Sequence, residues 1–403
     1  MYDVIVVGAR CAGASTAMLL AQKGYKVLLI DRMRFPSDVP HGIFLHRHGP
    51  QRLQRWGLLG QVEATGTSPI YTLLTDYGDY PMIGLDLQSN GVAYAYAPRR
   101  FALDPILVDA AIAAGAEFRE GFAVDDYLMQ GGRVEGIRGR DLGAHRVLTE
   151  RARLTIGADG RNSRLARAVG AATYLATPPL TCYYFSYWSG VQASGLEMYH
   201  RPGRLIIAHP SGGGLTAVLA VWRHEEMNVF RNDLEGNYLR SLDLAPDLQE
   251  RVYQGRREER IYGIGDLPNF VRQPFGPGWA LVGDAGCSKD PYLALGICDA
   301  FRDAEYLADA VDGGFSGTGS LDNALREYEC CRNAAIRVDY DTNIQYARLL
   351  PFPREVMRLR AAMRGQPELI NQFYRAEEGL IPRDEFFDPH NLRRILGRSR
   401  VPA

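Results

Sequence analysis

The 403-residue chain carries 46 Lys and Arg against 47 Asp and Glu, and 46% of its residues are hydrophobic. This balance is ordinary for a globular protein and argues against binding to nucleic acid or to an anionic membrane surface. No apolar run approaches the roughly 18 residues of a membrane span, and Val4–Val7 is too short for a signal peptide, so we expect a cytoplasmic protein.

A strand–helix–strand unit is predicted at the N-terminus. Val4–Val7 and Val27–Ile30 are short, continuous apolar runs, which are typical of parallel strands buried on both faces. Between them, Gly13–Lys23 is rich in helix formers and is followed by Gly24, a good helix stop. This pattern predicts the first βαβ unit of a nucleotide-binding domain.

The loop that joins this first strand to its helix reads Gly8-Ala-Arg-Cys-Ala-Gly13. In a dinucleotide-binding loop, Gly8 would make the tight turn and Gly13 would let helix and strand pack closely. Arg10 occupies the usual place of the middle glycine, so we expect its side chain to affect the phosphate site. Asp31 ends the second strand, where an acid binds ribose hydroxyls, and Arg32 follows it. This motif leaves open whether FAD or NAD binds.

The rest of the chain alternates between two kinds of segment. Helix-like and buried-strand patterns recur at 103–120, 154–158 and 280–283, whereas 71–97 and 181–262 are rich in Tyr, Val, Thr and Gly and predict a mainly antiparallel sheet. We therefore predict an α/β (α+β) fold, with a Rossmann-like nucleotide domain and an inserted substrate-binding sheet domain. The expected boundaries are 1–70, 98–180 and 263–318 for the nucleotide domain, 71–97 and 181–262 for the sheet domain, and 319–403 for a helical C-terminus.

Two further motifs follow predicted buried strands. Gly157-Ala-Asp159-Gly160 comes after the strand at 154–158, and Gly283-Asp284 comes after the strand at 280–283 and leads through Pro291 and Gly296 into a helix. With the N-terminal loop, they resemble the group A flavoprotein monooxygenases, a family that includes aromatic hydroxylases, epoxidases, halogenases and geranylgeranyl reductase-like enzymes. The resemblance covers roughly residues 1–310.

This resemblance implies FAD as cofactor and NAD(P)H as electron donor, and it implies roles for particular residues. Arg100 would contact FAD phosphate or ribose, Asp159 and Gly160 would serve FAD and NAD(P)H docking, and Pro291 would lie beside the flavin ring. The backbone of Leu295, Gly296 and Ile297 would point a helix N-terminus at the flavin N1–C2=O edge, where reduction builds negative charge. The residues expected to bind cofactor are Gly8, Arg10, Gly13, Asp31, Arg32, Arg100, Asp159, Gly160, Gly283, Asp284, Leu295, Gly296 and Ile297.

Substrate-side candidates are fewer. His46 precedes a predicted helix at Pro50–Leu59, and His209 ends a strand of the predicted sheet domain; with Pro291 they form the predicted catalytic set. Tyr183–Trp188 alternates as a strand whose aromatic side chains fit either a substrate pocket or a core. The cysteines form no CxxC pair and the histidines have no metal-ligand spacing, so we expect no metal.

We therefore expect an FAD-dependent monooxygenase that hydroxylates or epoxidises a small apolar, aromatic or polyketide-like metabolite of secondary metabolism. A C=C reductase of the geranylgeranyl reductase type is the nearest alternative, and a flavin-binding protein without oxygenase turnover is another. A partner flavin reductase is a second source of electrons. A halogenase fits poorly, because it needs an early lysine and none lies between Lys26 and Lys289.

Overall fold

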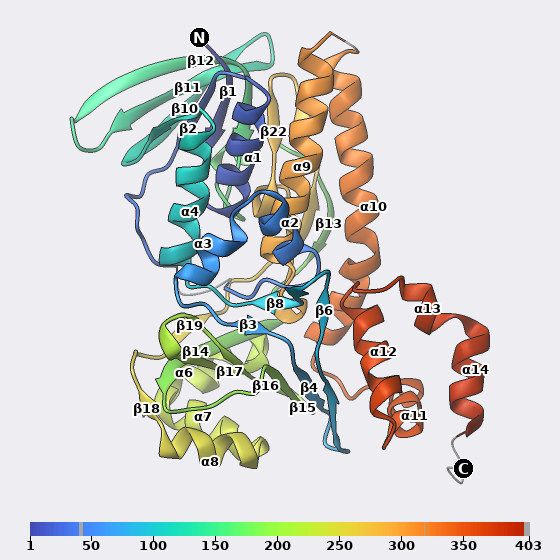
Figure 1. Ribbon diagram of the computed structural model, residues 1–403. Helices are drawn as coiled ribbons and strands as arrows, with labels where there is room; N and C mark the ends of the chain where they lie inside the picture. Colours follow the sequence, from blue (N-terminus) through green and yellow to red (C-terminus); the bar gives the residue numbers. More distant parts are fainter. Residues whose placement is uncertain (40–42, 318, 399–403) are drawn as a thin grey trace. The chain divides into compact units, whose positions relative to one another are not determined.

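The computed structural model describes residues 1–39, 43–317 and 319–398 (Figure 1). The chain divides into two compact units, each assembled from three segments. Unit 1 comprises 1–43, 99–178 and 267–344, and unit 2 comprises 44–98, 179–266 and 345–403. The predicted mixed fold, with strands of one domain inserted between segments of the other, is confirmed.

Unit 1 is built on an eight-stranded sheet whose main path runs β10-β11-β12-β1-β2-β9. The strands β1, β2, β9 and β22 and the C-terminal half of β12 are parallel. Except in the edge strand β9, most of their side chains are buried, which explains the continuous apolar runs. The strands are β1 (Tyr2–Val7), β2 (Val27–Ile30), β9 (Glu117–Arg119), β10 (Phe122–Gln130), β11 (Arg133–Asp141), β12 (Arg146–Gly157), β21 (Phe275–Gly276) and β22 (Trp279–Leu281).

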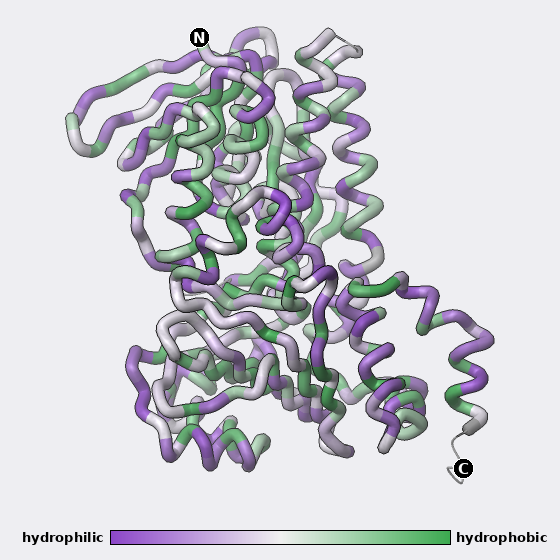
Figure 2. The backbone as a smooth tube through the Cα atoms, in the orientation of Figure 1, coloured by the Kyte–Doolittle hydropathy of each residue, from purple (hydrophilic) through white to green (hydrophobic). Residues whose placement is uncertain are grey.

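The helices of unit 1 include α1 (Cys11–Gln22), α4 (Arg100–Ala113), α5 (Arg164–Ala168), α9 (Gly296–Phe315) and α10 (Leu321–Ala347). Helix α1 packs against both α4 and α9. Figure 2 shows α9 and α10 alternating between hydrophobic and hydrophilic residues along their length, as helices with one buried face do. A small sheet of β13 (Thr173–Thr177), β20 (Asn269–Arg272) and β23 (Cys287–Ser288) completes this unit.

Unit 2 contains a second eight-stranded sheet, with path β18-β14-β17-β16-β15-β4-β5 and β19 paired to β14. It is antiparallel except between β15 and β4. Its strands are β4 (Leu73–Asp76), β5 (Pro81–Gly84), β14 (Thr181–Ser189), β15 (Leu196–Arg201), β16 (Arg204–Pro210), β17 (Thr216–Arg223), β18 (Arg256–Arg257) and β19 (Tyr262–Ile264). Two-stranded pairs join β3 (Pro69–Ile70) to β8 (Ala95–Tyr96) and β6 (Gln88–Ser89) to β7 (Val92–Ala93).

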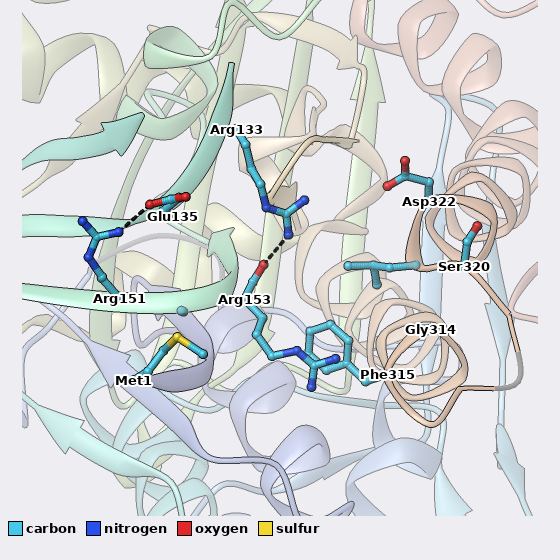
Figure 3. Close-up of a pocket in the computed structure, with 11 residues that line it drawn as sticks. Met1, Arg133, Glu135, Arg151, Arg153, Gly314, Phe315, Ser320 and Asp322 are labelled. Carbon is cyan, nitrogen blue, oxygen red and sulfur yellow. Dashed lines mark hydrogen bonds and ion pairs between the residues drawn. The ribbon is translucent and has the colours of Figure 1, made fainter. Parts of the chain in front are cut away.

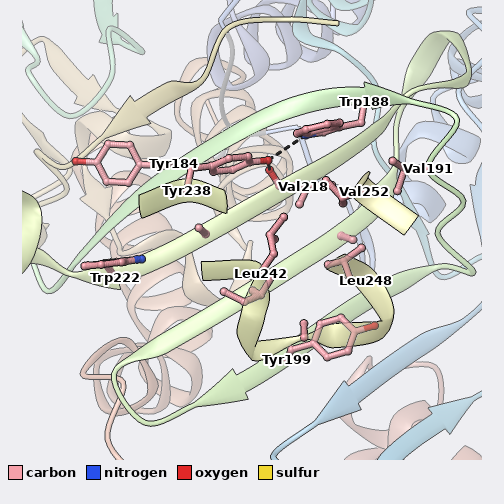
Figure 4. Packing of buried hydrophobic residues seen from close by; sticks show 14 of the residues in the cluster. Tyr184, Trp188, Val191, Tyr199, Val218, Trp222, Tyr238, Leu242, Leu248 and Val252 are labelled. Carbon is pink, nitrogen blue, oxygen red and sulfur yellow. Dashed lines mark hydrogen bonds between the residues drawn. The ribbon is translucent and has the colours of Figure 1, made fainter. Parts of the chain in front are cut away.

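The segment 181–262, predicted to form a mainly antiparallel sheet, also contains three helices that were not predicted. They are α6 (Met227–Asn232), α7 (Leu234–Ser241) and α8 (Pro246–Gln254). Apolar residues spaced four to eight apart, Phe230, Tyr238, Leu242, Leu248 and Val252, bury one face of these helices against the sheet (Figure 4). The helical period therefore outweighs the Tyr and Val content of the segment.

This packing explains one face of the aromatic strand β14. Tyr184 and Trp188 lie in the core under α6, α7 and α8, where Tyr184 stacks on Phe230 and Trp188 Nε1 donates to the Tyr238 hydroxyl, 3.0 Å away. The alternate residues Tyr183, Phe185 and Tyr187 project from the opposite face of β14. A purely structural role thus holds for one side of the strand.

The compact units differ from the predicted domain boundaries in two places. Residues 44–70, which hold α2 (Gly49–Arg55) and α3 (Leu59–Ala64), group with unit 2. Helix α10 packs in unit 1 instead of a separate C-terminal part, because Tyr328 donates to Leu281 O and Arg332 to Arg272 O. The last helices, α11 (Arg354–Met363), α12 (Pro367–Glu377), α13 (Arg383–Phe387) and α14 (Pro389–Arg398), belong to unit 2.

Candidate functional site

The N-terminal loop requires glycine at two positions. Gly8 has φ +104°, and a Cβ there would lie 2.4 Å from the carbonyl oxygen of Ala158. A Cβ on Gly13 would lie 1.7 Å from the carbonyl oxygen of Gly8. Strand and helix therefore approach as in a dinucleotide-binding loop, and the first-turn N–H groups of α1 are left for an anion.

Arg10 directs its side chain to a carboxylate that the sequence analysis missed. Its Nη1 lies 2.6 Å from Asp104 Oδ2, while Arg100 Nε donates to Asp104 Oδ1 at 2.8 Å. Asp104 is fully buried, and Cys11 Sγ lies 3.6 Å from Asp104 Oδ1. The spacing of Arg100 and Asp104, four residues apart at a helix start, was the available signal. Two arginines around one carboxylate leave a net positive charge beside the loop, which suits a pyrophosphate.

Asp31 is buried and holds the loop from the second strand. Its Oδ2 accepts from the backbone N–H of Ala9 at 2.8 Å, and its Oδ1 accepts from that of Met33 at 2.8 Å. Arg32 is exposed beside it. The carboxylate thus lies at the carboxyl end of β2, next to the glycine loop, as predicted for the ribose site.

Asp159 and Gly160 follow β12 directly. Asp159 Oδ2 accepts from the backbone N–H of Arg164 at 2.7 Å, and Gly160 turns the chain at φ +77°. Among the residues that the structure describes, the buried Oδ1 of Asp159 and the buried Nε of Arg161 have no hydrogen-bond partner. Buried polar atoms without partners are costly, so this turn fits a bound polar group.

Gly283 and Asp284 occupy the matching position after β22. Gly283 has φ +62°, and a Cβ on it would lie 2.8 Å from the Cβ of Ala12, so glycine lets this turn reach α1. The Asp284 side chain is exposed, yet the surrounding protein raises the pKa of its carboxyl group, with Arg161 and Arg100 opposing this shift.

The loop from Lys289 to Leu295 is held on both sides by buried asparagines. The Asp290 N–H donates to Asn269 Oδ1 at 2.6 Å, and Asn343 Nδ2 donates to the Asp290 carbonyl at 2.9 Å. Asn343 Oδ1 also accepts from the Leu293 N–H at 3.0 Å. Neither asparagine was predicted, because each is distant in sequence and lies in no motif.

This loop delivers Pro291 and the start of α9. Pro291 is half-buried, Leu295 is the N-cap residue, and Gly296 is exposed, with nothing within 4 Å of where a Cβ would be. Ile297 follows, and the helix begins at Gly296 as expected. The open space at Gly296 and the partial positive charge of the helix N-terminus can accept the electron-rich edge of a planar ring.

The two predicted catalytic histidines belong to unit 2, whereas Pro291 belongs to unit 1. His46 Nδ1 lies 2.8 Å from Glu378 Oε2, and the ring of Phe44 contacts both His46 and His209, with centroid distances of 5.5 and 5.3 Å. His209 Nδ1 lies 2.9 Å from the Pro210 carbonyl oxygen, and burial lowers the His209 pKa to about 4. Glu378 is 332 residues from His46, so sequence reasoning did not find it.

A separate hollow of about 580 Å³ lies in unit 1 among Met1, Arg133, Arg151, Arg153 and Phe315 (Figure 3). It is at the amino end of β1, opposite the carboxyl end that carries Gly8. Nucleotides bind at the carboxyl ends of parallel strands, and these arginines are engaged by Glu135, Asp3 and the Arg153 carbonyl. This hollow is therefore not the nucleotide site.

Within the described residues, no cluster of His, Cys, Asp or Glu is arranged to hold a metal ion. No helix among them is long and apolar enough to cross a membrane. Cys287 packs in a core with Val271, Ile336 and Tyr340, and burial raises its pKa to about 12. It is thus a core residue.

Comparisons with known proteins agree with this geometry. Residues 1–233 match the family model described as FAD binding domain. A digeranylgeranylglycerophospholipid reductase of Methanosarcina mazei is 28% identical over 320 residues, which cover 76% of this chain and 74% of that protein.

Two solved structures share the fold. The probable FAD-dependent monooxygenase pqsL from Pseudomonas aeruginosa has a TM-score of 0.74 at 20% identity, covering 87% of this chain and 96% of its own. The myxobacterial chondrochloren halogenase CndH has a TM-score of 0.78 at 20% identity, covering 100% of this chain and 98% of its own.

Proposed function

This chain is an FAD-dependent oxidoreductase that belongs to the FAD binding domain family, that of the group A flavoprotein monooxygenases, and from that premise we propose that it inserts oxygen into a small aromatic or polyketide-like metabolite. NAD(P)H donates the electrons; one atom of O2 enters the product, and the other leaves as water. The observation that carries this proposal is the buried group of Phe44, His209 and the His46–Glu378 pair in unit 2.

The residues of unit 1 fit FAD. The glycine turns at Gly8, Gly13 and Gly283 bring backbone close together, and the half-satisfied Asp159 and the exposed Asp284 offer carboxylate oxygens to hydroxyl groups. Once bound, FAD supplies electron transfer and oxygen activation. The chain's own part is to hold the pyrophosphate at α1, to orient the ring at α9, and to keep water away.

Unit 2 offers a flat apolar surface for a substrate ring. On the sheet face opposite α6, α7 and α8, strands β14, β16 and β17 present Phe185, Ile207, Leu219 and Val221, with His209 at the end of β16. Phe44 covers His209 edge-on. These side chains would exclude water from an aromatic substrate and hold it by ring contacts.

The His46–Glu378 pair gives this surface a proton-handling group. A carboxylate at 2.8 Å fixes the imidazole orientation and stabilises the imidazolium that forms when the ring accepts a proton. We assign His46 the task of taking a proton from a hydroxyl or amino group of the substrate. An isoprenoid chain has no such proton, which is why the pair favours the oxygenase over a C=C reductase.

The reductase stays the second candidate because a digeranylgeranylglycerophospholipid reductase is among the curated relatives. Incorporation of oxygen from O2 into the product distinguishes the oxygenase from the reductase. We expect product made under ¹⁸O2 with NADH or NADPH to carry one ¹⁸O atom, as measured by mass spectrometry. A reduced, unlabelled product formed under anaerobic conditions would replace the oxygenase with the reductase.

A further arm of the same experiment tests the electron source. We expect NADH or NADPH alone to reduce the bound flavin. Reduction that occurs only after a flavin reductase is added would assign that role to a partner protein. Bound FAD that neither donor reduces, with or without a reductase, would favour a flavin-binding protein without turnover.

A further inference from the structure

Lys289 is the buried lysine of a chain that has only three. Its side chain is 6% exposed and its Nζ lies 2.5 Å from Asp299 Oδ2, in the first turn of α9. Burial opposes the charge on Lys289, but Asp299 outweighs burial, so the lysine pKa is raised. The ion pair thus holds a full charge next to the helix N-terminus, where a neutral side chain would be cheaper to bury.

Other charges surround this pair. Arg302 Nη1 lies 2.6 Å from Asp299 Oδ1 and its Nη2 lies 2.8 Å from Asp303 Oδ1. Arg332 also acts on Asp303, and Asp284 acts on both Lys289 and Asp299. Removal of Lys289 would make the N-terminal end of α9 more negative by one charge.

This added negative charge would oppose the partial positive charge at the start of α9. The first turn of α9 carries the partial positive charge of a helix N-terminus, and an Asp299 carboxylate that only Arg302 pairs with would offset more of that charge. Reduction of a bound flavin adds negative charge to the edge expected to face this turn. Lys289 cancels Asp299 and so keeps the turn positive.

We propose that Lys289 sets the redox potential of the bound FAD by neutralising Asp299 at the start of α9. This inference rests on the FAD site of unit 1 and not on oxygen chemistry. Lys289 acts through Asp299 and is a positioning residue for charge, not a group that reacts.

The test measures the midpoint potential of bound FAD by dye-coupled reduction at pH 8. We expect K289M to weaken binding of reduced FAD about tenfold relative to oxidised FAD, a shift of about 30 mV to more negative potential. D299N should shift the potential in the opposite direction, because it leaves Lys289 unopposed. The double variant K289M/D299N should return close to wild type.

Lys23, at the end of α1, supplies a control because it pairs with carboxylates of the same helix α9. Its Nζ pairs with Asp309 at 3.0 Å and Asp312 at 3.2 Å, far along α9 from Gly296. K23M removes an equal charge from a more exposed pair far from the helix start, and we expect no shift. K289R, which keeps the charge, should stay nearer to wild type than K289M.

Potential shifts of opposite sign in K289M and D299N would indicate an electrostatic effect, because loosened packing would not reverse the sign. Shifts of the same sign in K289M and D299N, or no shift in either, would overturn the proposal. If K289M does not retain FAD, the midpoint potential of D299N alone tests the proposal. An unchanged potential in D299N would then overturn the proposal. Failure of ¹⁸O incorporation would not affect these potentials, so the two proposals fail separately.

Discussion

Asp284 and Asp159 each follow a parallel strand of unit 1, but they are engaged differently. Asp159 Oδ2 already accepts from Arg164 N–H, whereas Asp284 is exposed and is influenced by the charges of Arg161 and Arg100. We therefore expect the Asp284 carboxylate to serve cofactor binding and the Asp159 carboxylate to serve the local turn structure.

We predict that Asp284→Ala weakens FAD binding by about 1.5–3 kcal/mol, the cost of a charge-assisted hydrogen bond. Asp159→Ala should have the smaller effect on FAD affinity and should instead slow reduction by NAD(P)H. Fluorescence titration of apoprotein and stopped-flow reduction measure the two effects. The opposite ranking would exchange the roles of the two motifs.

His200 is a second residue that leads to a prediction, here about how the stability of the fold depends on pH. It is buried between Tyr77 and Phe352, and burial together with the charges of Arg360 and Arg201 lowers its pKa to about 3. The unfolded chain takes up this proton near pH 6.5 and the folded chain near 3. Stability is therefore fully present above pH 6.5 and falls by about 1.4 kcal/mol per pH unit below it.

We predict that His200→Phe makes the stability of unit 2 less sensitive to acid between pH 6.5 and 4, because phenylalanine keeps the ring contacts and takes no proton. Urea unfolding at a series of pH values measures the slope. A variant with the wild-type slope would show that His200 is protonated in the folded protein.

At the scale of elements, α10 supports the flavin-side loop without belonging to any motif. Asn343 bonds both the Asp290 carbonyl and the Leu293 N–H, and it is 1% exposed. The loop can hold Pro291 and the start of α9 in place only while this helix is packed. Lys289 lies in the same loop, so its pairing with Asp299 depends on the same support.

We predict that Asn343→Ala costs about 1–3 kcal/mol of stability, since it leaves buried backbone groups without partners, and that it also weakens FAD binding. Thermal unfolding with and without FAD measures both. Asn323→Ala on the exposed start of the same helix is the control, and it should change neither. Equal effects of the two variants would contradict a role for the loop.

At the scale of the whole molecule, each unit is assembled from three stretches of chain, so neither can be produced by a simple truncation. The residues expected to bind the cofactor, however, come from all three stretches of unit 1, among them Gly8, Asp159 and Asp284. Ligand binding to a folded unit stabilises that unit as a whole.

We predict that FAD at 100 times its Kd stabilises unit 1 by about 2.7 kcal/mol. Hydrogen exchange of apoprotein with and without FAD should show the strongest new protection at residues 8–13, 158–161 and 283–297. Protection confined to unit 2, or absent altogether, would mean that the site has been misplaced.

The sequence by itself determined the local chemistry of the cofactor site. Gly8, Gly13, Asp31 and Gly283 could be predicted because a strand, a tight turn and a helix are specified by neighbouring residues. The class of fold followed for the same reason, since continuous apolar runs identify buried parallel strands.

The tertiary structure decided the pairings between distant residues. Asp104 with Arg10, Asn343 with Leu293, and Glu378 with His46 are 94, 50 and 332 residues apart. An arginine-rich chain offers many ion pairs that sequence spacing cannot distinguish. Only packing selects among them, because a buried charge is tolerated where its partner is fixed at hydrogen-bond distance.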